Sequence, residues 1–108
     1  MLVLIVSEGP PPLGSTVSEG GALRAWGLAK GLASNGHAVT LAYRSTFDIA
    51  EDAKKTNIPG GVTITTWNGD LLPELIASHK VIVLRYAMGE AGEIIKHLTA
   101  EHILVSDS

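Results

Sequence analysis

The sequence predicts an α/β fold, in which a parallel sheet of about five strands lies between two layers of helices. Hydrophobic residues make up 45% of the 108-residue chain and charged residues only 18%. That composition is too apolar for a disordered chain, and it suits strands that are buried on both faces of a sheet. Apolar runs of strand length also alternate with helical patterns, which favours right-handed crossovers and parallel strands within one domain.

Four continuous apolar runs predict buried strands, and they cover Leu2–Val6, Ala38–Tyr43, Lys80–Leu84 and His102–Val105. A fifth run, Val62–Trp67, alternates Val or Ile with Thr, which is typical of an edge strand with one wetter face. Because the first run is uninterrupted and the Thr-rich run alternates, we place the first strand at the centre of the sheet. The expected strand order is 3-2-1-4-5, with every neighbouring pair parallel.

The clearest helix is predicted over Glu19–Ser34, with Ser18 as its N-cap and Asn35-Gly36 supplying the left-handed residue that ends it. Apolar residues at helical spacing form the stripe that faces the sheet. The stripe consists of Ala22, Ala25, Trp26, Ala29, Leu32 and Ala33, and the opposite face of Arg24, Gly27, Gly31 and Ser34. Shorter helices are predicted over Phe47–Lys54, over Leu72–Ala77 with Pro73 in the first turn, and over Gly89–Leu98.

Charge and composition argue against several classes of function. The formal charge is −3, from 8 Lys and Arg against 11 Asp and Glu, and no basic cluster stands out, so we expect no nucleic-acid partner. The histidines do not fall at metal-ligand spacings and the chain has no cysteine, so we expect no metal and no cofactor. The lack of cysteine is compatible with a cytoplasmic location, which we predict. The opening apolar run is too short for a signal peptide or a membrane span.

The segment after the first strand is the place to look for a ligand, because open α/β sheets bind ligands beyond the carboxyl ends of their strands. This loop runs from Ser7 to Gly21 and is longer than the usual 2 to 6 residues. It lacks the Gly-x-Gly-x-x-Gly fingerprint and any Gly-Lys-Ser/Thr, which argues against an NAD or ATP site. Gly20 and Gly21 at the helix N-terminus either hold an anion on free backbone N–H groups or serve close packing.

The first forty residues resemble the opening of the group 1 (retaining, GT-B) glycosyltransferases. The resemblance consists of a strand, Pro10-Pro11-Pro12, Gly20-Gly21 and a helix that runs into Leu32-Ala33-Ser34-Asn35-Gly36-His37-Ala38-Val39-Thr40-Leu41. It implies a Rossmann-like, acceptor-side N-terminal domain over residues 1–108, with a second, donor-binding domain that these residues do not contain. It also implies that Gly20 and Gly21 contact the diphosphate of a nucleotide-sugar donor.

Under this resemblance the chain is half of an enzyme that moves a sugar from a nucleotide-sugar donor to an acceptor. Alone it is expected to be inactive, and to self-associate through surface that the missing domain covers. Possible acceptor or cleft contacts are Arg85, Glu90 and Asp107, although solvated charges are the competing interpretation for the first two. No chemistry is assigned to His37, His79, His97 or His102. The alternative function is a standalone flavodoxin-like or Rossmann-like module that binds a small ligand.

Overall fold

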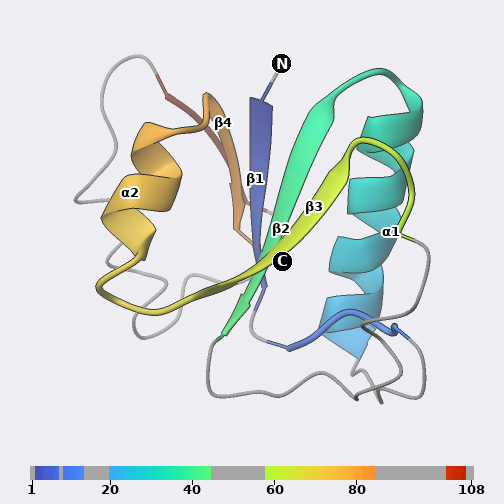
Figure 1. Cartoon of the computed structure of the whole chain (residues 1–108), viewed down its shortest axis with the longest axis horizontal. Helices are drawn as coiled ribbons and strands as arrows, with labels where there is room; N and C mark the ends of the chain where they lie inside the picture. The colour runs from blue at the N-terminus through green and yellow to red at the C-terminus, as the bar shows by residue number, and fades with distance from the viewer. Residues whose placement is uncertain (1, 8, 14–19, 45–57, 85–101, 107–108) are drawn as a thin grey trace.

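A computed structural model describes residues 2–7, 9–13, 20–44, 58–84 and 102–106 of the chain. It contains a five-stranded sheet in the order β3-β2-β1-β4-β5 (Figure 1), and each neighbouring pair is parallel. The predicted fold class, strand order and central first strand are therefore confirmed. The strands are β1 (Leu2–Ser7), β2 (Ala38–Arg44), β3 (Val62–Trp67), β4 (Val81–Leu84) and β5 (Ile103–Ser106).

Two helices in the described part of the chain cover opposite faces of this sheet, as Figure 1 shows. They are α1 (Gly20–Ser34) and α2 (Leu72–Ala77). Alternate residues of β1 point to the two sides, which explains why its sequence is apolar throughout. The α1 side holds Val3, Ile5, Ala25, Ala29, Val39, Leu41 and Val83, and the α2 side holds Leu4, Val6, Ala42, Trp67, Leu72, Ile76 and Ile82. The fold is a three-layer sandwich with a separate core cluster on each face.

Helix α1 begins one residue after the predicted start and ends where predicted. Gly36 adopts a φ of 91°, which is the left-handed conformation that glycine accepts at little cost. The Gly36 N–H donates to the Ala33 carbonyl at 3.1 Å and the His37 N–H to the Leu32 carbonyl at 3.2 Å. This pair of bonds is a Schellman motif, which satisfies carbonyls that the helix end leaves without partners.

The exposed and buried faces of α1 also follow the prediction. Arg24, Gly27, Gly31 and Ser34 are exposed, while Ala22, Ala25 and Ala29 are buried. Leu32 and Ala33 were expected in the buried stripe and are only half-buried, and so is Trp26. The Lys30 ammonium lies 5.6 Å from the centre of its ring, so one part of the indole packs against the core and another meets a cation.

Helix α2 has the predicted bounds, and side chains satisfy the carbonyls of its last turn. The Ser78 hydroxyl donates to the Glu74 carbonyl at 2.7 Å. His79 Nδ1 donates to the Leu75 carbonyl at 2.7 Å, and His102 Nε2 donates to the Ile76 carbonyl at 2.9 Å. A carbonyl oxygen only accepts, so Nδ1 of His79 and Nε2 of His102 each carry a hydrogen. The two histidines thus have a structural role in tying α2 to the segments before β4 and β5.

Several predicted elements lie outside the described residues, namely the N-cap at Ser18 and the helices over Phe47–Lys54 and Gly89–Leu98. The strands agree with the prediction to within a residue at each end. Of these differences, the extension of β2 to Arg44 matters for the site. Neither described helix combines the length and the apolar character needed to cross a membrane.

Candidate functional site

The candidate site is the edge of the sheet at which the parallel strands end. Ser7, Arg44 and Trp67 are the last residues of β1, β2 and β3. In the strand register Ser7 lies opposite Tyr43, and Arg44 lies opposite Trp67. Helix α1 follows β1, so its N-terminus lies at this same end of the molecule (Figure 1). In open α/β sheets, this is the edge where ligands bind.

The first part of the loop after β1 packs against α1. The Ser7 hydroxyl donates to the Gly9 carbonyl at 3.0 Å. A Cβ on Gly9 would lie 3.3 Å from the Cβ of Ala22, so the missing side chain lets the loop come close to the first turns of the helix. Pro10, Pro11 and Leu13 are buried. The Pro-rich sequence therefore anchors the first part of the loop against the domain.

Gly20 and Gly21 are the first two residues of α1. The first backbone N–H groups of a helix have no partner within the helix, and the helix dipole places positive potential there. Among the described residues, the first turn of α1 carries no acidic side chain. The structure places both glycines at the carboxyl edge of the sheet, as the sequence predicted.

On the other side of the same edge lies an aromatic and cationic pair that sequence reasoning missed. Trp67 is fully buried, and its indole Nε1–H donates to the Ser7 carbonyl at 2.7 Å. The Arg44 guanidinium lies 5.0 Å from the centre of the Trp67 ring, which is within cation–π range. The indole thus joins the ends of β1 and β3, and its face holds a positive charge at the end of β2.

A signal for this pair was available in the sequence, but it was incomplete. The second strand was predicted to stop at Tyr43, one residue short of Arg44. In Val62–Trp67, the tryptophan falls on the same face as Thr63 and Thr65, which was expected to be the wetter face. Only the register of the two strands shows that the two residues meet.

The remaining predicted contacts, Arg85, Glu90 and Asp107, lie outside the described residues, as does His97. His37 is half-buried in the turn before β2. Within the part of the chain that the structure describes, no three His, Asp or Glu residues come close enough together to hold a metal ion.

Comparison with known proteins gives no match: no family model, no curated protein and no solved structure matches this chain. The fold and the edge described above define a Rossmann-like α/β domain, and the function has to be argued from its own residues.

Proposed function

We propose that the chain is the acceptor-side half of a retaining GT-B glycosyltransferase, in which Gly20 and Gly21 contact the diphosphate of a nucleotide-sugar donor. The observation that supports this proposal most strongly is the start of α1 at Gly20-Gly21, after a loop that leaves the central strand at the carboxyl edge. A helix N-terminus attracts phosphate through its free N–H groups. The absence of two side chains lets a diphosphate approach the backbone closely.

The chemistry follows from the charge that develops during transfer. The bond between the sugar and the diphosphate breaks, and a bond to an acceptor hydroxyl forms with retention at the anomeric carbon. Negative charge then grows on the leaving diphosphate. Backbone N–H groups held in place by a helix stabilise such charge without having to reorganise during the reaction. Arg44, whose guanidinium stacks on Trp67, adds a cation at the same edge of the sheet.

The proposal assigns most donor contacts to a second domain, so residues 1–108 alone are expected not to turn over any nucleotide sugar. Donor, diphosphate ligands and acceptor have to be held together for transfer. Transfer or donor hydrolysis by the purified 108-residue chain would contradict the half-enzyme interpretation.

The decisive experiment replaces Gly20 or Gly21 with valine. In the enzyme that carries both domains, each change should lower the rate of sugar transfer at least about tenfold, which corresponds to about 1.4 kcal/mol of transition-state binding. The melting temperature of the 108-residue chain should stay nearly unchanged.

Gly27→Val is the matched control, because Gly27 lies exposed on the same helix and a Cβ added there would meet no neighbouring atom within 4 Å. It should preserve transfer. The opposite pattern, in which the chain unfolds while transfer per folded molecule survives, would assign Gly20 and Gly21 to packing.

The alternative function is a standalone module that binds a small ligand. The observation that favours it is the presence of a buried core cluster on each face of the sheet within this one chain, which is what an independent domain needs. Under the alternative, the 108-residue chain alone binds a mononucleotide, and Gly20→Val removes that binding. Titration with uridine diphosphate, followed by the backbone amide signals of Gly20 and Gly21, separates the two functions. Micromolar binding without a second domain would favour the module.

A further inference from the structure

The outer edge of β3 is a candidate for pairing with another strand. Among the described residues, β3 pairs only with β2. The Val39 N–H donates to the Gly61 carbonyl at 2.8 Å, and the backbone groups of a parallel strand alternate in direction. The backbone N–H and C=O groups of Thr63 and Thr65 therefore point towards β2. Those of Ile64 and Thr66 point away from the sheet.

The residues of β3 themselves lack several features by which proteins block unwanted pairing. Native edges are protected by charged residues, proline or bulges. The sequence of β3, Val-Thr-Ile-Thr-Thr-Trp, contains no charge and no proline, and its register with β2 is continuous, without a bulge. All six residues are of types that favour strands. β3 is therefore an extended and uncharged strand with which an added strand could pair.

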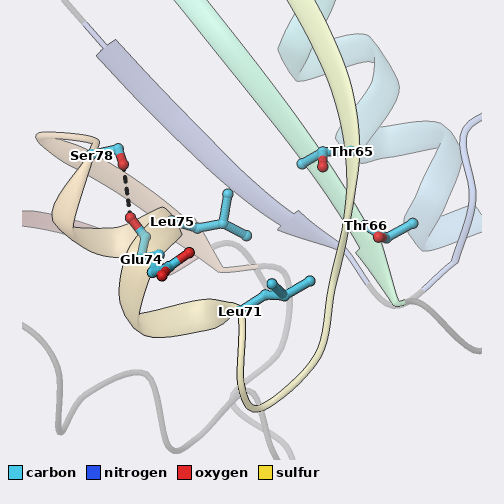
Figure 2. A pocket seen from close by; sticks show the side chains of 6 residues that line it. All are labelled: Thr65, Thr66, Leu71, Glu74, Leu75 and Ser78. Atoms are coloured by element: carbon cyan, nitrogen blue, oxygen red, sulfur yellow. Dashed lines mark hydrogen bonds between the residues drawn. The ribbon is translucent and has the colours of Figure 1, made fainter.

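A groove lies beside this edge, between β3 and α2 (Figure 2). Its volume is about 210 Å³, and Thr65, Thr66, Leu71, Glu74, Leu75 and Ser78 line it. In Figure 2 the two threonines lie on one side of the groove, and the leucines and Glu74 on the other. Leu71 is 39% exposed, so the helix side of the groove offers apolar surface to a binding partner.

The charge of the groove indicates what kind of partner fits. Glu74 is exposed, and no basic residue lines the groove. The structure records no ion pair for Glu74 within the described part of the chain. Asp70, in the turn that leads into α2, is also exposed. Glu74 therefore gives the groove an acidic side chain beside the apolar side chains of Leu71 and Leu75.

We propose that β3 and this groove bind an extended, basic peptide segment of a partner protein by strand addition. The peptide backbone pairs with Ile64 and Thr66. Because side chains alternate along a strand, every second residue of the peptide faces the groove. A leucine there meets Leu71 and Leu75, and a lysine two residues away meets Glu74. Strand addition of this kind takes affinity from the main chain and specificity from pockets for alternate side chains.

The test uses the 108-residue chain and a blocked synthetic peptide, Thr-Leu-Thr-Lys-Thr-Leu-Thr-Lys, with a second peptide in which glutamate replaces lysine. We expect the lysine peptide to shift the backbone amide signals of Ile64 and Thr66 and to saturate at one peptide per chain. It should bind about threefold more tightly than the glutamate peptide, since a partly exposed ion pair contributes about 0.2–1 kcal/mol. Equal affinity of the two peptides would overturn the proposal.

Two variants with the same net charge separate the contact of Glu74 from a general effect of charge. Glu74→Gln and Ala77→Lys each raise the net charge by about one unit, and Ala77 is exposed on the same helix but does not line the groove. Glu74→Gln should remove the preference for the lysine peptide, and Ala77→Lys should preserve it. Equal effects of the two variants would mean that only net charge matters, which would overturn the proposed contact.

Strand pairing can be tested by removing the N–H groups of the peptide backbone. Lysine peptides N-methylated at the odd or at the even residues lose the N–H groups along one edge only, so one of the two should lose binding and the other should keep it. Equal binding or equal loss would exclude strand addition. Shifts of Ile64 and Thr66 that grow with protein concentration in the absence of peptide would assign the edge to a second copy of this chain and overturn the proposal.

Discussion

Trp67 shows how one side chain can organise the carboxyl edge. It is the last residue of an edge strand, yet it is fully buried, since it lies on the α2 side of the sheet and reaches the end of the central strand. Its indole N–H donates to the carbonyl of Ser7, where β1 ends and the loop begins. The same ring positions Arg44. Contacts that join residues 60 positions apart in the chain cannot be read from local sequence patterns.

Replacing Trp67 with phenylalanine should lower the free energy of unfolding by about 1–3 kcal/mol, because the buried Ser7 carbonyl loses its donor. The measurement is urea denaturation followed by far-ultraviolet circular dichroism. The matched control is Trp26→Phe at a half-buried position, which should cost clearly less. Equal losses would mean that ring size, and not the hydrogen bond, sets the effect.

The elements differ in how far their own sequence determines them. The end of α1 was predictable because Asn35-Gly36 acts locally through the left-handed conformation of Gly36, and α2 was predictable because Pro73 marks its first turn. The alternation in Val62–Trp67 likewise identified the edge strand. The ends of strands depend on partners that are distant in the chain, so β2 was predicted one residue short. For the same reason, no local pattern showed that His79 and His102 complete α2.

Helix α2 has only 6 residues, too few for a stable isolated helix, so it should depend strongly on these outside contacts. His79→Ala removes both the bond to the Leu75 carbonyl and the bond between His79 Nε2 and the Thr40 hydroxyl, which is 2.7 Å long. We expect a loss of about 1–2 kcal/mol in the free energy of unfolding and faster amide hydrogen exchange in α2. His37→Ala, at a turn position, is the control and should leave exchange in α2 unchanged. Similar exchange in the two variants would contradict the role assigned to His79.

At the scale of the whole molecule, β5 carries apolar side chains on the α1 side of the sheet that no described helix covers. Ile103 and Val105 of β5 pair with Val81 and Val83, which belong to the α1 side. Helix α1 packs over β1, β2 and β3, so this side of β5 lies beyond it. Ile103 is 48% exposed and Val105 is 44% exposed. Adjacent exposed apolar side chains at an edge are the kind of surface that finds a partner.

The self-association expected of this chain should therefore depend on β5. Sedimentation velocity of the 108-residue chain at increasing concentration should show oligomers. The double variant Ile103→Thr, Val105→Thr should shift the chain towards monomer, because threonine keeps the branched shape and removes apolar surface. Leu23→Thr, at a residue with 49% exposure on α1, should have little effect. A starting chain that stays monomeric at high concentration would contradict this prediction.

The central position of β1 has a consequence for synthesis on the ribosome. β1 is made before the two strands that pair with it, and these two partners emerge at different times. β2 and β3 follow soon after α1, so three adjacent strands and one helix can assemble from residues 2–67. The other edge of β1 stays open until Val81–Leu84 has left the ribosome, and Leu4 and Val6 stay uncovered until α2 does. During that interval the nascent chain exposes an unpaired strand edge and half of its core, which is the state that chaperones recognise.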